Sequence, residues 1–292
     1  MSGFRRILGV AISVALLAGC WIDENTVWNN GMDPVNLRNT GMVYVAGGTF
    51  RMGGDTTVVD QAIAAGATEH SVTISAFLMD STEVTQKTWV ELMGSNPSGF
   101  KNCLDCPVEG VTWFDAILFC NARSRNQGLD TVYTWSGAVV DNGRVVGMAS
   151  VRQDRMRNGY RLPTEAEWEC AARGGTEGWW YWGDDSTKSV EYGWLRANAQ
   201  ARTHPVATLA RTGAGLYDMQ GNVWEWTWDW HSVFSTAAQV DPSGPATGGY
   251  RVFRGGCIND RSGIPKNGDR EYNTPDHASA VLGFRCARSL VP

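Results

Sequence analysis

The stretch GLYDMQGNVWEWTWDW, residues 215–230, decides the fold. Its second half alternates strictly, with an indole at Trp224, Trp226, Trp228 and Trp230. Successive side chains of a strand point to opposite faces, so a strand here places four indoles on one side. Tryptophans bury large apolar areas, so packing in a core is the first interpretation of this face. A stacking platform for a sugar or a peptide is the alternative.

Helix signals lie upstream of this strand. In YRLPTEAEWE, residues 160–169, Thr164 and Glu167 form a capping box that predicts a helix starting after Pro163. Thr112 and Asp115 give the same signal for a second helix. A shorter helix is expected over residues 86–93, closed by Gly94. Strands are expected over residues 42–46, 49–52 and 72–79, with a hairpin turning at residues 141–143.

Composition narrows the class of protein. The 292 residues carry a net charge of −5, with 43% hydrophobic and 19% charged residues, which supports a sizeable core and excludes wholesale disorder. No basic run is present, so nucleic acid is not an expected partner. The chain is rich in glycine (34) and tryptophan (14), which favours a loop-rich fold over a helical bundle. We expect one domain over residues 41–289.

The N-terminus has the charge order of a secretory signal. Arg5 and Arg6 precede an apolar run that ends in Leu17-Ala18-Gly19-Cys20, which is similar to a bacterial lipobox. This resemblance implies a signal peptide over residues 1–19, lipidation of Cys20 and a tether over residues 20–40. The expected location is the cell envelope. The outer membrane or cell surface is favoured, because residue 21 is Trp and not the aspartate that signals retention in the inner membrane in many Gram-negative bacteria.

Export makes disulfides the default state of the six remaining cysteines. Cys103 and Cys106 form a C-x-x-C without a second metal-ligating pair nearby, which favours a local disulfide over zinc or a redox dithiol. The other cysteines allow three pairings, and the sequence does not choose among them. They are Cys120, Cys170, Cys257 and Cys286.

A series of short motifs follows in fixed order along the chain. The motifs are residues 47–53 (GGTFRMG), 83–85 (EVT), 96–98 (NPS), 107–113 (PVEGVTW), 160–169, 215–226, 254–256 (RGG) and 283–286 (GFRC). Together they resemble the formylglycine-generating enzyme, or sulfatase-modifying factor, family over nearly all of residues 41–289. The resemblance implies an α+β fold, the family's variant of the C-type lectin fold, with little regular secondary structure.

Oxidising members of that family bind copper through two cysteines in the loop that follows Arg-Gly-Gly. Soft thiolates suit Cu(I), so the chemistry requires both. Here Asp260 falls where the first cysteine is expected, the second position is near Pro265, and no cysteine occurs between Ile258 and Arg285. We therefore expect no copper cofactor and no formylglycine formation, and we assign no catalytic residue.

The family's calcium site maps onto Asp218, Gly221, Val223 and Glu225. The two carboxylates supply charge and the two backbone carbonyls supply neutral oxygens, the hard ligands that calcium prefers. Calcium is therefore a candidate cofactor. A turn held by a salt bridge or by backbone hydrogen bonds is the alternative.

The loop over residues 257–273 is polar, mixed in charge and framed by well-matched segments. It resembles the variable region of lectin-fold proteins that retroelements diversify. We expect a non-catalytic surface lipoprotein that binds an extracellular protein or glycan, with formylglycine oxidase or structural envelope component as alternatives. The predicted ligand contacts are Asn259, Asp260, Arg261, Lys266, Asn267, Asp269, Arg270 and Tyr272.

Overall fold

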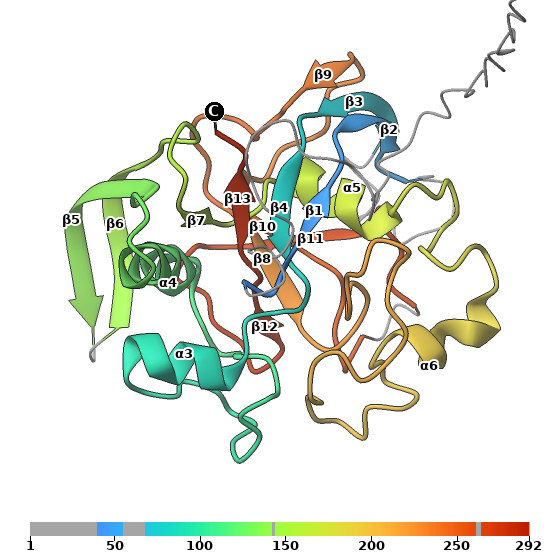
Figure 1. The fold of residues 1–292 in the computed structure, drawn as a ribbon, viewed down its shortest axis with the longest axis horizontal. Helices are drawn as coiled ribbons and strands as arrows, with labels where there is room; N and C mark the ends of the chain where they lie inside the picture. Colours follow the sequence, from blue (N-terminus) through green and yellow to red (C-terminus); the bar gives the residue numbers. More distant parts are fainter. Residues whose placement is uncertain (1–39, 55–67, 142–143, 261–263, 292) are drawn as a thin grey trace, which may run out of the picture.

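The computed structural model describes residues 40–54, 68–141, 144–260 and 264–291 (Figure 1). The predicted signal peptide and tether, with the lipidation site Cys20, lie outside the described residues except at Thr40. Within the described ranges, no helix is both long and apolar enough to cross a bilayer.

One sheet joins the two ends of the domain. Its strand order is β1 (Met42–Val45), β4 (Phe77–Asp80), β13 (Ala287–Ser289), β7 (Tyr160–Arg161). Strand β4 pairs antiparallel with both β1 and β13, so residues more than 200 positions apart become neighbours at the Asp80–Cys286 contact. Figure 1 shows the C-terminal end emerging beside β13.

A second sheet has the order β2 (Gly48–Met52), β3 (His70–Ile74), β9 (Gln239–Val240). The single strand predicted over residues 72–79 is wrong, because the chain breaks between β3 and β4 and enters a different sheet. Ser75 marks the break: its backbone N–H and its hydroxyl both donate to the Asp241 carboxylate, at 2.7 and 2.6 Å.

The sheet that carries the candidate site has the order β11 (Arg270–Asn273), β10 (Arg251–Arg254), β8 (Trp224–Trp230), β12 (Leu282–Gly283). The predicted tryptophan strand is confirmed as β8. Trp226 is fully buried, Trp224 and Trp228 pack half-buried against the core, and Trp230 is half-buried and stacks on Trp113, which supports packing as their main role. The opposite face of β8 is also covered, since Glu225 and Asp229 are buried beneath the third predicted helix.

The three predicted helices are confirmed as α3 (Gln86–Met93), α4 (Trp113–Asn126) and α5 (Glu165–Arg173), and two short ones, η1 (Ser186–Lys188) and α6 (Ser189–Tyr192), follow. Both predicted capping boxes form, with reciprocal bonds between the N-cap threonine and the acidic residue at the third helical position. Each such cap contributes about 1 kcal/mol by satisfying backbone donors that the helix leaves free.

The predicted hairpin is confirmed as β5 (Tyr133–Asp141) and β6 (Arg144–Gln153), with Asp141 opposite Arg144. It forms a two-stranded ribbon at one side of the molecule (Figure 1). Val139 and Val140 near its tip are 57% and 61% exposed.

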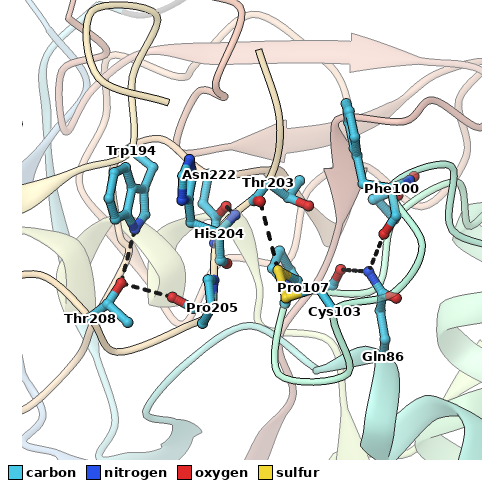
Figure 2. The surroundings of a disulfide bond; sticks show 12 residues. Gln86, Phe100, Cys103, Pro107, Trp194, Thr203, His204, Pro205, Thr208 and Asn222 are labelled. Carbon is cyan, nitrogen blue, oxygen red and sulfur yellow. Dashed lines mark hydrogen bonds between the residues drawn. A yellow bond between two sulfur atoms is a disulfide. The ribbon is translucent and has the colours of Figure 1, made fainter. Parts of the chain in front are cut away.

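The predicted Cys103–Cys106 disulfide is present (Figure 2). It fixes a tight loop whose neighbours hold it on two sides. The Gln86 backbone N–H donates to the Cys106 carbonyl at 2.9 Å, and the Cys106 sulfur lies 3.7 Å from the Thr203 carbonyl oxygen. The loop therefore ties α3 to the segment after residue 202.

Buried ion pairs connect helix and sheet inside the fold. Arg161 bonds Glu167, Arg254 bonds Glu169 and Arg285 bonds Glu225, and all six side chains are at most 1% exposed. Removing one partner of such a pair leaves an uncompensated buried charge, which costs about 3–5 kcal/mol. Single substitutions in these pairs should therefore disturb the packing of α5 against β7 and β10, or that of β8 against the segment around Arg285.

Candidate ligand-binding site

The predicted binding loop connects two neighbouring strands. Strand β10 pairs antiparallel with β11, from Arg251 opposite Asn273 to Arg254 opposite Arg270, so residues 255–269 form the connection at one end of the sheet. The loop leaves β10 through Gly255 and Gly256, whose φ angles of 97° and 77° lie in the left-handed region that glycine adopts without strain.

The loop folds back onto its own start. A Cβ atom built on Gly256 would lie 1.9 Å from Cγ of Pro265 and 3.2 Å from Oδ2 of Asp260. Pro265 and Asp260, which stand near the expected copper-cysteine positions, therefore pack against Gly256. No side chain larger than hydrogen fits at that glycine unless the loop moves.

Cys257 is the loop's cysteine, and it is 4% exposed. Its sulfur accepts a weak hydrogen bond from the Asn259 N–H at 3.4 Å. Burial raises the pKa of Cys257 to about 11, so the thiol is protonated at neutral pH. One buried, protonated thiol does not fit a Cu(I) site, which needs two thiolates. The other free thiols among the described residues, Cys120 and Cys286, lie next to each other, 3.8 Å apart.

Two of the predicted contact residues point inward. Asn267 is fully buried: its side-chain oxygen accepts from the Gln220 amide at 2.9 Å, and its N–H donates to the Trp179 carbonyl. Arg270 is 4% exposed and holds Glu165 in a two-point ion pair, at 2.8 and 2.6 Å. These two side chains anchor the loop and β11 to the body of the protein, and they are not presented to a ligand on the loop's outer surface.

The other described members of the set lie nearer the surface. Asn259 and Tyr272 are exposed, and Asp260, Lys266 and Asp269 are partly exposed. The Lys266 ammonium lies 3.7 Å above the ring of Trp179, and the Asp269 carboxylate accepts the Lys266 N–H at 2.9 Å. Burial raises the pKa of Asp269. Arg261 lies outside the described residues.

An aromatic surface adjoins these residues on β11. Tyr272, 41% exposed, stacks on His231 with ring centres 3.8 Å apart and meets Tyr250, 49% exposed, edge to face at 5.4 Å. Burial and the nearby Arg270 lower the pKa of His231, so its ring is neutral at pH 7. Exposed tyrosines that hold each other in place are well suited to contact a ligand, because little conformational entropy is lost on binding.

Three of the predicted calcium ligands, Asp218, Gly221 and Val223, lie on the turn before β8, and Glu225 is the second residue of that strand. Asp218 has a φ of 56° and Gly221 a φ of 90°, and a Cβ on Gly221 would lie 2.3 Å from the Trp194 carbonyl oxygen. Both oxygens of Glu225 accept from Arg285, at 2.7 Å each, and one also accepts from the Trp168 indole. Asp218 accepts the Ala207 N–H through Oδ2, while its buried Oδ1 has no hydrogen-bond partner among the described residues.

Glu83 adds a further carboxylate that the sequence analysis treated only as part of a motif. It is 1% exposed, and neither of its oxygens has a hydrogen-bond partner in the described part of the chain. Burial and the charge of Asp218 raise its pKa well above the usual range, and burial raises the pKa of Asp218 to about 6. The unpartnered oxygens of Asp218 and Glu83 fit a hard cation, whereas Glu225 already has Arg285 as its counter-ion. Calcium at this turn therefore stays a prediction.

Comparison with known proteins matches residues 29–290 to the family model described as "Sulfatase-modifying factor enzyme 1-like domain". The chain is 35% identical over 267 residues to the chaperone protein LppX of Paenibacillus barcinonensis, covering 84% of each. It is 32% identical to the formylglycine-generating enzyme of Thermomonospora curvata, covering 85% of this chain and 93% of that enzyme.

The structure is similar to that of Treponema denticola variable protein 1, with a TM-score of 0.74 and 33% sequence identity over 85% of this chain and 94% of that one. These similarities, with the mixed helix and strand content, confirm the resemblance on which the sequence analysis relied. They also confirm the predicted α+β fold of the formylglycine-generating enzyme type.

Proposed function

The chain belongs to the sulfatase-modifying factor enzyme 1-like family, and we propose that it is a non-catalytic binding protein of the cell envelope. In this proposal the family scaffold is retained without the copper chemistry, and the loop over residues 257–273 contacts an extracellular protein or glycan. Fold and function separate readily, so the proposal rests on the site and not on the family name.

The packing of the loop onto Gly256 is the observation that carries the proposal. Asp260 and Pro265 stand near the positions where an oxidase of this family needs its two thiols. Both side chains lie so close to Gly256 that a Cβ atom at that residue would contact them. The remaining thiol, Cys257, is buried and protonated at neutral pH. The loop's own residues thus support binding and give no support to copper-dependent oxidation.

The division of the loop into anchoring and presented side chains supports a binding role. Asn267 and Arg270 hold the loop from inside, and Asn259, Asp260 and Tyr272 reach the surface. Binding residues commonly lie on loops that a rigid scaffold positions. Similarity to a protein that carries the name "variable protein" adds support for a loop whose outward residues differ among relatives.

The N-terminal sequence supports an envelope location. The apolar run after Arg5 and Arg6 and the lipobox-like Leu17-Ala18-Gly19-Cys20 favour export and lipidation. Several acyl chains, each gaining about 0.8 kcal/mol per buried CH₂, would hold the protein on a membrane. Mass spectrometry of the protein from the membrane fraction tests for acyl chains on Cys20. A Cys20→Ser variant that stays as firmly membrane-bound as the wild type contradicts the lipid anchor.

A second candidate function is that of a chaperone. Similarity to LppX over most of both chains favours it, and the exposed tyrosines of the aromatic surface could contact unfolded polypeptide. Suppression of aggregation of a chemically denatured model protein, abolished by Tyr272→Ala, is the result that separates this function from the binding of a folded ligand.

The loop assignment is tested with a glycan array and a displayed peptide library, probed with the full chain. Any ligand selected by the wild type should bind Asn259→Ala/Tyr272→Ala more weakly by about tenfold or more. Met156→Ala is the matched control, because Met156 is 74% exposed but lies outside the loop. Equal binding by the loop variant shows that the site is elsewhere.

The oxidase alternative is tested on the same protein. Copper-loaded protein is incubated with a cysteine-containing sulfatase peptide while oxygen consumption and peptide mass are followed. Retained copper together with conversion of the peptide refutes the non-catalytic assignment. Stoichiometric co-purification of an envelope protein, unaffected by the loop variant, points instead to a structural component of a complex.

A further inference from the structure

A separate cavity of about 320 Å³ lies apart from the outer surface of the loop. Its walls come from β3, from the start of α5, from the end of β8 and from the connection over residues 232–245. Arg270 of β11 closes one side. This volume is at the lower end of the range for small-molecule sites, which are concave and combine apolar walls with a few fixed polar groups.

His70 lines this cavity and carries a nitrogen without a hydrogen-bond partner among the described residues. The side chain is 2% exposed, and its Nδ1 lies 3.2 Å from the Thr68 carbonyl oxygen. A carbonyl only accepts, so the contact favours the tautomer with the proton on Nδ1, in which Nε2 is an acceptor. Nε2 is buried and has no partner among the described residues. Leaving such a buried group unsatisfied is unfavourable, and a donor on a ligand would remove that cost.

Asp229 supplies a second polar group. It is 4% exposed, and its Oδ2 accepts the Glu165 N–H at 2.9 Å. Burial, followed by the charge of Glu165, raises the pKa of Asp229 to about 8, so the carboxyl is protonated at neutral pH. It is therefore an uncharged group with an O–H to donate and oxygen lone pairs to accept.

The charged residues of the cavity compensate each other. Arg270 and Glu165 form a two-point ion pair, and Arg270 also donates to the Ser232 carbonyl. A charged ligand would lose its hydration without meeting an available counter-ion, which is costly. The cavity therefore favours a neutral ligand.

The remaining walls combine apolar surfaces with small polar side chains. Phe234 packs against the His70 ring, with centres 4.9 Å apart, and Trp230 lies nearby in the lining. Gln239 and Ser243 add an amide and a hydroxyl. A ligand that fits must donate to Nε2 of His70, exchange hydrogen bonds with Asp229 and place an apolar face on the aromatic rings.

A hydroxyl group both donates and accepts, and a pyranose ring combines several hydroxyls with an apolar face. We propose that this cavity binds one neutral, hydroxyl-rich sugar unit, either free or at the end of a glycan. The proposal is independent of the loop surface, since the two groups that the ligand must satisfy, His70 and Asp229, lie on β3 and β8.

The test is saturation-transfer NMR and calorimetry with glucose, galactose and N-acetylglucosamine, alongside the charged analogues glucosamine and glucuronate. Binding of at least one neutral sugar, with charged analogues weaker by about tenfold or more, is expected. A methyl glycoside that binds as well as the free sugar identifies a terminal unit as the source, and loss of binding on methylation identifies the free sugar.

Two variants locate the site. Ser243→Trp fills the cavity from a surface loop and should abolish sugar binding without lowering the unfolding midpoint, whereas Ser243→Thr should retain it. His70→Phe removes the unpartnered acceptor and should weaken binding by about tenfold without loss of stability. Absence of binding by every neutral sugar at millimolar concentration, or undiminished binding by Ser243→Trp, overturns the proposal.

Discussion

Substitution of Arg285 by methionine tests the buried ion pair between Arg285 and Glu225 of β8. Arg285 is fully buried, bonds both oxygens of Glu225 at 2.7 Å, and donates to the carbonyls of Tyr217 at 2.9 Å and Asp80 at 3.3 Å. Methionine keeps much of the apolar stem and removes the charge. Glu225 would keep the Trp168 indole as its partner, and the Asp218 carboxylate adds negative charge close by.

The expected loss in the free energy of unfolding is about 3–5 kcal/mol, which is the usual cost of removing one partner of a buried ion pair. The carbonyls of Tyr217 and Asp80 would also lose their bonds from Arg285, which adds about 1 kcal/mol for each. A domain has only about 5–15 kcal/mol in total, so the variant should be near its limit of stability at 25 °C. Urea unfolding followed by tryptophan fluorescence measures the difference.

The double variant Arg285→Met/Glu225→Gln is the matched control. It removes the stranded charge, so it should recover most of the stability that Arg285→Met loses. A loss below about 1 kcal/mol in the single variant, or no recovery in the double variant, refutes the reasoning.

Calcium gives the same experiment a second use. If Ca²⁺ binds the predicted ligands, which include Asp218 and Glu225, it should stabilise Arg285→Met more than the wild type, because it replaces a missing cation. Saturation at 100 times the dissociation constant is worth about 2.7 kcal/mol. Equal unfolding curves with calcium and with a chelator, for both proteins, contradict the calcium prediction.

Three further predictions follow from single contacts. Mild oxidation should join Cys120 and Cys286, whose sulfurs are 3.8 Å apart, and stabilise the fold by up to about 5 kcal/mol; a non-reducing peptide map without the linked pair refutes this. Because the pKa of Asp229 is raised to about 8, wild-type stability should fall relative to Asp229→Asn by about 1.4 kcal/mol per pH unit as pH rises from about 4 to 8, and parallel stability curves contradict it. Gly221→Ala should cost at least about 2 kcal/mol, because its φ is 90° and the new Cβ would lie 2.3 Å from the Trp194 carbonyl oxygen; an unchanged unfolding midpoint rules out that strain.

The sequence predicted well where the signal is local. The capping pairs Thr112–Asp115 and Thr164–Glu167 span three residues, so the helix starts could be located directly. The Cys103–Cys106 disulfide and the alternating strand β8 are of the same kind. The residues that form each of these patterns are close together in the sequence, and tertiary packing preserves the local structure that they favour.

What the sequence left open depends on distant partners. Glu165 and Arg270 are 105 residues apart, and their ion pair turns a predicted ligand contact into an anchor. The break at Ser75 depends on Asp241, 166 residues away. No periodicity within a strand or a loop encodes such pairs, so the inward or outward direction of the loop residues required the folded structure.

The arrangement of this loop has a consequence for how the protein can change over time. The residues that keep β11 in place, Asn267 and Arg270, interact with the interior, while Asn259 and Tyr272 contribute little to the core. Selection can therefore alter recognition at the outer positions while the folding free energy stays nearly constant. A library randomised at residues 259 and 272 should yield mostly folded members, and one randomised at 267 and 270 should not.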